Sequence, residues 1–451
     1  MKNNTALQRM GTDREGHLLF AMVLPIALSM LVQALYNIVD SAFVGQVSEA
    51  ALSAVSVVFP FQSLFAALNV GIGVGMSQLI SMCMGTGQEK DAGRAAGQGL
   101  FLSLCCSAFF LIFGLFFPGS FFALSGIGGG IAQMGTDYLQ IITVFSLGIF
   151  CESVLERMLM STGRTACTMV CQITGAAVNI ILDPVLIFGW GPFPAMGVKG
   201  AAIATVIAQH LAAVLALIFH LRRNRVLRFT LSDLRPHLKT LKRICGVGSS
   251  AALKQGAAAV VLMLVNSLLF RFSETATAVY GAFNRLYVFF MTPSWAIEDV
   301  LVVLAAYNLG IRSRKRLLRL FRLSLFSALG ITVLGCGLIF LIPAPLLKIF
   351  GAEEAMLELG TEALPILACF LPFQTVSSTV SAMLQGLGEG RDALIAGLTE
   401  RFVLPITLVF LFSLTGNLTL VWWSFTMAEA LGLVISALFM KKAFRKKVSV
   451  L

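Results

Sequence analysis

The chain has 451 residues, of which 57% are hydrophobic and only 12% are charged. A soluble domain carries roughly twice that charged fraction. The apolar residues stand in long runs, so we expect an all-α polytopic membrane protein rather than a barrel, whose strands would alternate over short segments. The net charge of +11 is concentrated in a few segments, which argues against a nucleic-acid-binding protein.

Turn signals and charged segments divide the chain into twelve predicted spans. They are 17–44, 52–84, 94–117, 134–161, 166–189, 198–221, 243–271, 277–308, 317–342, 356–385, 392–413 and 417–440. Several exceed the roughly 20 residues that cross a bilayer, so those helices must tilt, bend or project from it. The predicted organisation is an N-terminal tail (1–16), a six-helix lobe (17–221), a basic linker (222–242), a second six-helix lobe (243–440) and a basic tail (441–451).

Basic residues indicate the orientation of these spans. Of the 33 Lys and Arg residues, 26 lie in segments assigned to one side, 3 in segments assigned to the other side and 4 within spans. Because cytoplasmic loops carry an excess of Lys and Arg, we expect both termini in the cytoplasm and the chain in the cell membrane. The basic linker is interpreted as a topology-setting segment at the lipid surface.

Short motifs recur about 225 residues apart. "VSEAALSAVSV" from Val47 aligns with "FSETATAVYGA" from Phe272, and Gly163 aligns with Gly388. Because six helices separate the copies, both halves keep one orientation, as in a parallel repeat with a central cavity. Such a repeat favours a transporter in which one lobe rocks against the other.

Several ionisable residues fall well inside the predicted spans, where such groups are costly and by default face protein or water. They are Asp40, Glu152, Glu156, Arg157 and Asp183 in the first half, and Lys254, Arg285, Glu298, Asp299, Glu400, Arg401 and Glu429 in the second. Asp40 and Asp183 lie at a similar depth, because their two helices run in the same direction. The repeat places Val265 and Phe410 at the equivalent positions, so the acidic pair belongs to the first lobe alone.

Polar residues surround both acids at helical spacing. Gln33, Tyr36, Asn37 and Asp40 share one face of the first helix, and Asn179 lies one turn before Asp183. Carboxylate, amide and hydroxyl oxygens suit a small hard cation such as Na⁺. Buried carboxylates could equally take up protons, or be held by structural hydrogen bonds.

Other residues in the spans leave more than one interpretation open. Glu156/Arg157 and Glu400/Arg401 lie near cytoplasmic helix ends and are interpreted as structural pairs. Lys254, Glu298 and Asp299 either pair with a nearby charge or line the cavity. Pro25 removes a backbone hydrogen bond from the first helix and permits a bend.

Two segments give the chain a family resemblance. "LPIALSMLVQALYNIVDSAFVGQVSEAALSAVSVVFPF" and "QITGAAVNIILDPVLIFG", followed by "MGVKGAAIATVIAQ", resemble the signatures of the multidrug and toxic compound extrusion (MATE) family in its prokaryotic branch. The resemblance covers essentially the whole chain. It implies a monomeric secondary antiporter that exports cationic or amphipathic small molecules, has no cofactor and is driven by H⁺ or Na⁺.

The resemblance also assigns residues. It implies cation coupling at Asp40, Asn179, Asp183 and Thr205, with Na⁺ as one candidate ion. It places Gln33 and Tyr36 at the cavity of the first lobe, where we also expect Asn37 from the same helix face, and it implies a helix bend at Pro25. Some members use an acid in the seventh helix, where this chain has Lys254 and Gln255, so coupling in the first lobe is favoured.

Three other functions fit the sequence less well. A flippase or exporter of a lipid-linked saccharide is the alternative within the larger fold, but such relatives have further helices or strongly cationic cavities. An intramembrane enzyme finds no support, because the four histidines are scattered and neither HExxH nor a P-loop occurs. A channel would be distinguished by its currents.

Overall fold

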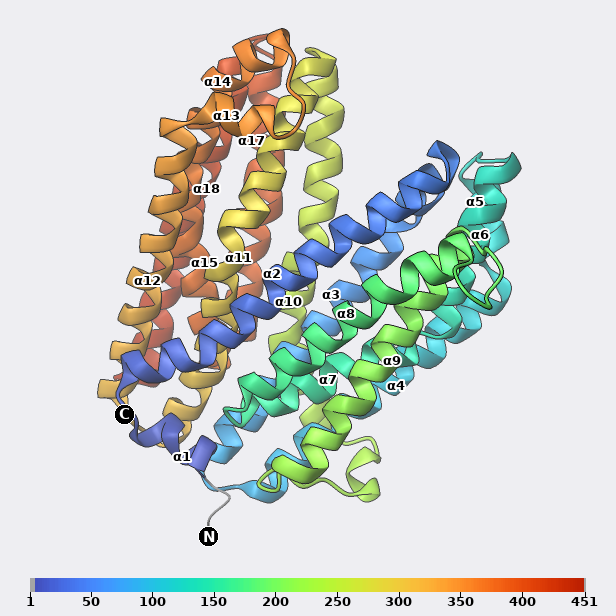
Figure 1. The fold of residues 1–451 in the computed structure, drawn as a ribbon. Helices are drawn as coiled ribbons and strands as arrows, with labels where there is room; N and C mark the ends of the chain where they lie inside the picture. Colours follow the sequence, from blue (N-terminus) through green and yellow to red (C-terminus); the bar gives the residue numbers. More distant parts are fainter. Residues whose placement is uncertain (1–4, 450–451) are drawn as a thin grey trace. The chain divides into compact units, whose positions relative to one another are not determined.

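The computed structural model describes residues 5–449, and over that range it contains helices and no strand, as Figure 1 shows. The first half comprises α1 (Thr5–Thr12), α2 (Glu15–Val47), α3 (Glu49–Gly85), α4 (Glu89–Phe116), α5 (Pro118–Leu124), α6 (Gly129–Val144), α7 (Leu147–Ser161), α8 (Thr165–Phe188) and α9 (Val198–Arg223). The prediction of an all-α protein is confirmed.

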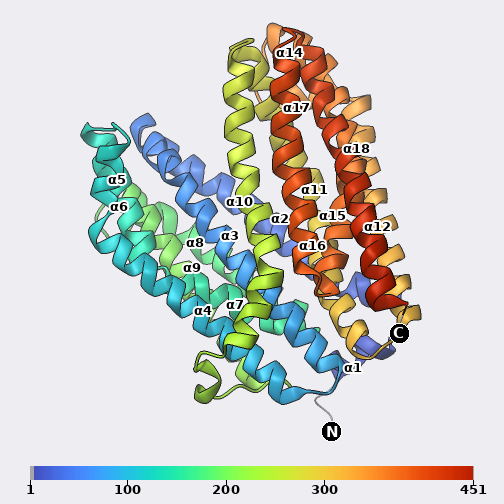
Figure 2. The ribbon, with the colours of Figure 1, turned by 180° about the vertical axis from the view of Figure 1, so that it is seen from behind.

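The second half follows a short helical turn, η1 (Leu231–Leu234). It comprises α10 (Leu238–Phe270), α11 (Glu274–Gly310), α12 (Arg314–Leu341), α13 (Pro343–Lys348), α14 (Glu354–Ala368), α15 (Phe370–Gly386), α16 (Gly390–Leu398), the π-helical segment η2 (Thr399–Val403), α17 (Leu404–Ser413), α18 (Leu418–Ala443) and the π-helical segment η3 (Phe444–Val448). Figure 2 shows this half from behind.

The number of membrane-crossing helices agrees with the prediction. Within residues 5–449, eleven helices or continuous helical runs are long and apolar enough to cross a membrane. The pair α6 and α7 makes a twelfth, bent by 46°. The chain is therefore a multi-pass membrane protein.

Helices α3 and α11 begin three residues earlier than predicted, because a serine caps the first turn of each. The Ser48 side chain accepts a hydrogen bond from the Ala51 N–H at 3.0 Å, and that of Ser273 accepts one from the Ala276 N–H at 2.9 Å. A serine cap satisfies one of the free N–H groups of a first turn. The two caps start α3 and α11, and they lie at equivalent positions of the repeat.

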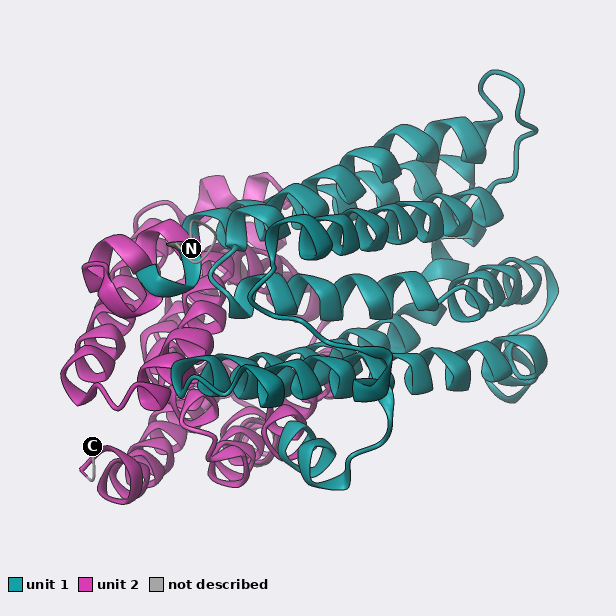
Figure 3. Cartoon of the chain, turned by 90° about the horizontal axis from the view of Figure 1, so that it is seen from below, with its two compact units in different colours: residues 1–9, 24–245 teal, residues 10–23, 246–451 magenta. Residues whose placement is uncertain are grey.

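Contacts divide the described chain into two compact units, coloured in Figure 3. Unit 1 comprises residues 5–9 and 24–245, and unit 2 comprises residues 10–23 and 246–449. The boundary crosses α2 between Val23 and Leu24, directly before Pro25. The start of α2 is held in unit 2 by Arg316, which donates to the Asp13 carbonyl at 2.8 Å and lies 3.9 Å from the Glu15 carboxylate.

Each unit has its own apolar core. In unit 1, Phe65 and Phe110 meet edge to face with ring centroids 4.3 Å apart, and Phe150 stacks on Phe110. In unit 2, the buried Trp422 and Phe283 belong to a core built mainly from α10, α11, α14 and α18. Helices α7, α8 and α9 pack side by side in unit 1, and they carry most of the candidate site.

The basic linker is folded onto unit 1, which the sequence did not indicate. The buried Gln98 of α4 donates to the carbonyls of Asp233 and Arg235, at 2.6 and 2.7 Å, and accepts from the His237 N–H at 2.8 Å. A Cβ on Gly97 would lie 2.6 Å from Asp233, so a glycine is needed where the linker approaches α4. One amide side chain thus clamps the segment through three backbone groups.

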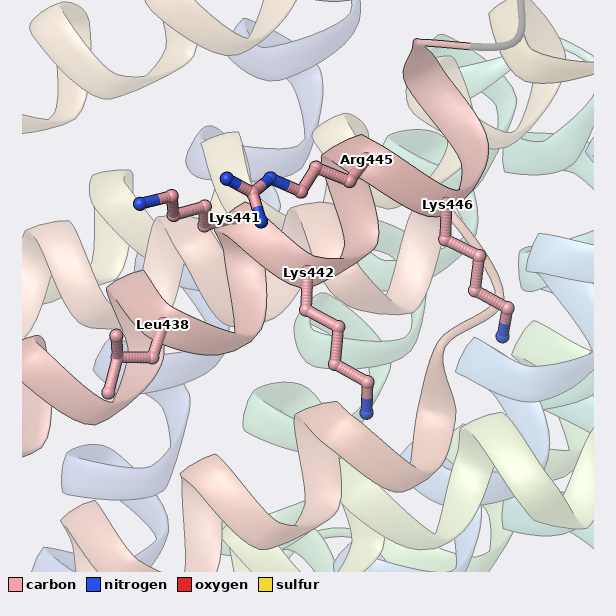
Figure 4. A pocket seen from close by; sticks show the side chains of 5 residues that line it. All are labelled: Leu438, Lys441, Lys442, Arg445 and Lys446. Atoms are coloured by element: carbon pink, nitrogen blue, oxygen red, sulfur yellow. The ribbon is translucent and has the colours of Figure 1, made fainter.

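The basic C-terminal end is also anchored. Figure 4 shows a surface pocket lined by Leu438, Lys441, Lys442, Arg445 and Lys446, in which Lys442 and Lys446 extend to the same side. Lys442 pairs with Asp392 at 3.0 Å, and Lys446 pairs with Glu389 at 3.0 Å. Burial acts to raise the pKa of Glu389, but Lys446 and Lys447 outweigh burial and hold that pKa below its usual range.

Candidate cation-binding site

Two acids from distant parts of unit 1 meet at the candidate site. The side chains of Asp40 on α2 and Asp183 on α8 interact directly. Asp183 is fully buried, and within residues 5–449 one oxygen of each carboxyl group, Oδ1 of Asp40 and Oδ2 of Asp183, is buried without a hydrogen-bond partner. Two ionised carboxylates in contact repel one another. A proton or a small cation between them would therefore stabilise the pair.

Asn179 and Thr205 complete the group. The Asn179 side-chain amide donates to Asp183 Oδ1 at 3.3 Å and lies 3.4 Å from Thr205 Oγ1 on α9. Its own Oδ1 is buried and has no partner among the described residues. The structure thus brings together all four residues assigned to cation coupling. Their oxygens form a donor set that fits a hard cation such as Na⁺, and the two acids also fit a proton.

Local structure explains how α8 and α9 hold these groups. Asn179 and Asp183 are one turn apart on α8, so both face the same side. Gly189 ends α8 with a φ of +77°, and a Cβ on Gly200 would lie 2.5 Å from the Leu186 backbone. Glycines at these two points permit the tight return that brings Thr205 beside Asn179.

The other polar residues of α2 differ in their surroundings. Tyr36 is partly buried and lies within electrostatic range of Asp40 and Glu152. Gln33 and Asn37 are exposed on the structure. Of these three residues, Tyr36 is therefore the one on which a second acid, Glu152 on α7, also acts.

Unit 2 holds its charged residues in a different way. Lys254 on α10 pairs with Glu298 on α11 at 3.3 Å, and the Ser378 hydroxyl donates to the same carboxylate at 2.5 Å. Glu298 is buried, whereas the adjacent Asp299 is only partly buried. The structure thus gives Lys254 an acidic partner within its own unit.

A second charged group in unit 2 has a partner that the sequence did not reveal. Arg401 of η2 lies 3.4 Å from Glu400 and 3.8 Å from Glu429 of α18. The Gln374 amide reaches Glu429 at 3.4 Å, and the Ser436 hydroxyl donates to Glu400 at 3.0 Å. Arg401, Gln374 and Glu429 also line a cavity of about 110 Å³ between aromatic rings. The three helices are far apart in sequence, so no spacing could have indicated this cluster.

The structure shows the hydrogen-bond partners of Glu156 in unit 1, which the sequence did not indicate. The Gln172 amide on α8 donates to Glu156 Oε2 at 2.8 Å, and the Thr168 hydroxyl donates to the Glu156 carbonyl at 3.3 Å. The spacing of four residues between Glu152 and Glu156 was the available signal, because it places both acids on one face of α7. Within residues 5–449, no group of three or more His, Cys, Asp or Glu side chains could hold a metal ion.

Comparison with known proteins shows which family the chain resembles. The MatE family model matches residues 25–185 and 251–411, so the second match begins 226 residues after the first. The Multidrug export protein MepA of Staphylococcus aureus (strain MRSA252) is 24% identical over 410 residues, which cover 90% of this chain and 89% of the relative. The protein of the same name from Staphylococcus haemolyticus (strain JCSC1435) is 25% identical over 428 residues, covering 95% and 93%.

A solved structure shows the same fold. "Crystal structure of MATE in the bent conformation" superposes with a TM-score of 0.91 at 24% identity, covering 99% of this chain and 100% of that chain. The two matches of the family model confirm the predicted repeat and cover more than half of the sequence. The chain belongs to the MatE family of membrane transporters, which are not enzymes.

Proposed function

We propose that this protein is a secondary active exporter, which moves cationic or amphipathic small molecules out of the cell in exchange for H⁺ or Na⁺. The observation that carries the proposal is the contact between Asp40 and Asp183, whose buried free oxygens require a cation or a proton. The similar proteins from Staphylococcus are named as multidrug export proteins, which supports small-molecule substrates.

The substrate and the coupling ion compete for the ionised form of Asp40 and Asp183, and this competition produces the exchange. Outward-facing protein takes up the coupling ion at Asp40 and Asp183 and releases its substrate. Neutralisation favours the inward-facing state, where the ion leaves and the re-ionised pair helps to bind a cationic substrate. Substrate and ion then have opposite effects on one equilibrium between two states, as exchange requires.

Helix α2 is the element that would transmit this change. It carries Asp40, and it passes from unit 2 to unit 1 beside Pro25, where a backbone hydrogen bond is missing. A bend at Pro25 would change the direction of the segment of α2 that carries Asp40. The similar structure described as bent is consistent with this role.

The distribution of basic residues indicates where the protein and its termini lie in the cell. The excess of Lys and Arg in the termini and in the linker supports cytoplasmic termini and residence in the cell membrane. We further propose that the protein works as a monomer embedded in lipid, because each half of the repeat supplies one lobe of a complete carrier.

The test is dye efflux in proteoliposomes with a pH gradient and a Na⁺ gradient imposed separately. We expect one of the two gradients to drive efflux of an ethidium-like cation, and Asp183→Asn to abolish that response. Asp91→Asn is the matched control, since Asp91 is exposed and pairs with Arg94 on its own helix. Wild-type efflux by the Asp183→Asn variant would refute the proposal.

A further inference from the structure

A line of polar groups continues from the candidate site along one face of α8. Gln172, Gly175, Asn179 and Asp183 are spaced three, four and four residues apart, so they lie above one another on the helix. Position 175 lies about 12 Å from position 183 along the axis at 1.5 Å per residue. The line runs towards the turn at 162–164, which joins α7 to α8.

Two glutamates of α7 face this line. Glu156 accepts the hydrogen bond of Gln172 at 2.8 Å. Glu152, one turn away, lies against Gly175, where an added Cβ would be 4.0 Å from its Oε1 and 3.3 Å from the Cβ of Ala212. The Glu152 carboxylate therefore lies beside α8 at the level of Gly175.

Tyr36 on α2 lies within electrostatic range of both the outer and the inner acids. The charges of Glu152 on α7 and of Asp40 and Asp183 all act on its hydroxyl group. The other titratable or charged groups that act on the two glutamates are Arg157 on α7 and Cys171 on α8. On α9, His210 packs against Gly148, one turn before Glu152, and its Nδ1 lies 2.8 Å from the Val206 carbonyl.

The polar groups along this face of α8, together with Glu156, include more hydrogen-bond acceptors than donors. In the described part of the chain, buried oxygens without a hydrogen-bond partner occur on Glu156, Gln172, Asn179 and Asp183. Glu156, Asn179 and Asp183 are each more than nine-tenths buried. Unpaired buried acceptors are costly, and a proton or a hydrogen-bonding water satisfies them.

We propose that Glu152 and Glu156 form an inner proton-transfer site that connects Asp40 and Asp183 with the turn at 162–164. This inference rests on the proposed function and selects H⁺ as the coupling ion. A proton leaves the neutral carboxyl group of the outer pair, which becomes a carboxylate again. The proton passes by way of the Tyr36 hydroxyl to the Glu152 carboxylate, then to Glu156, and finally to water at the inner end. Only O–H bonds break and form.

The test measures proton release and substrate binding separately in proteoliposomes of the full chain. For Glu152→Gln and Glu156→Gln we expect proton-coupled dye transport to fall by about tenfold or more, as for loss of a proton-transfer group, with dye affinity unchanged. Glu156→Asp should restore part of the rate. A larger solvent isotope effect in the Gln variants would show that proton transfer has become limiting, which a purely structural role would not produce.

Controls distinguish this inference from the proposed function. Asp137→Asn removes an acid of α6 that pairs with Lys199 at 3.1 Å, and it should leave the proton-coupled rate unchanged. Melting curves in detergent verify that each variant is folded. If Asp183→Asn abolishes coupling while both glutamine variants keep the wild-type rate, the inner site is wrong and the proposed function stands. If wild-type protein responds to Na⁺ alone, the inner site is overturned while export stands, and if it responds to neither gradient, both fail.

Discussion

The two units treat their buried charges in opposite ways. In unit 1, Asp40 and Asp183 contact each other, and neither forms an ion pair within residues 5–449. In unit 2, Lys254 pairs with Glu298, and Arg401 pairs with Glu400 and Glu429. The acidic pair of unit 1 therefore has no basic partner within residues 5–449, whereas the three glutamates of unit 2 each have one.

This difference arises on one duplicated framework. The serine caps of α3 and α11 are retained at equivalent positions, while the acids are not. On the proposed function, changes to the caps should therefore affect stability in both units, and changes to the acidic pair should affect transport.

Arg401→Met should be the most destabilising change. It leaves Glu400 and Glu429 buried without their cation, and breaking a buried pair in this way costs about 3–5 kcal/mol. We expect a large drop in the melting temperature of the purified protein in detergent. A melting temperature within a degree of wild type would show that the charges of unit 2 are not held together by Arg401.

Asp183→Asn should differ from Arg401→Met, because we expect it to change stability little and transport strongly. It removes a buried carboxylate that has no basic partner within residues 5–449, and the amide oxygen that replaces it can still accept a hydrogen bond from Asn179. We therefore expect stability within about 1 kcal/mol of wild type or slightly above it. Coupled transport should nevertheless be lost. Strong destabilisation, measured by the same melting assay, would mean that Asp183 serves the fold rather than the coupling.

Ser48→Ala and Ser273→Ala form a matched pair across the repeat. Each removes the hydrogen bond that caps its helix, which costs about 1 kcal/mol. Equal small shifts in melting temperature would sharpen the comparison, because they would show that the two units share their structural devices. A large effect in only one unit would indicate that the caps are not equivalent.

The smallest effect concerns the ion pairs of Glu389 in unit 2. Its pKa lies below the usual range because Lys446 and Lys447 favour the carboxylate. Since the folded-state pKa is lowered, the stabilisation is complete above the unfolded pKa and is lost as the pH falls through the folded one. The stability difference between wild type and Glu389→Gln, at most about 1 kcal/mol for a partly exposed pair, should be present at pH 7 and vanish in strong acid. A difference that persists in acid would contradict this account.

The sequence predicted the fold and the repeat, and it indicated which residues of α8 share a helix face, because each depends on local or periodic signals. Long apolar runs, an offset between motifs and the four-residue spacing of Asn179 and Asp183 are of this kind. It could not predict which charges meet. The partnership of Arg401 with Glu429, and the clamp of Gln98 on the linker, join residues from different helices through packing. Such contacts leave no pattern in one sequence.

On the proposed function, Asp40 and Asp183 couple export to an ion. The most direct measurement is the efflux of a cationic dye from proteoliposomes of wild type and Asp183→Asn, with pH and Na⁺ gradients imposed one at a time. The account predicts that a gradient accelerates efflux by wild type and has no effect on the variant. Equal acceleration of both proteins would contradict it.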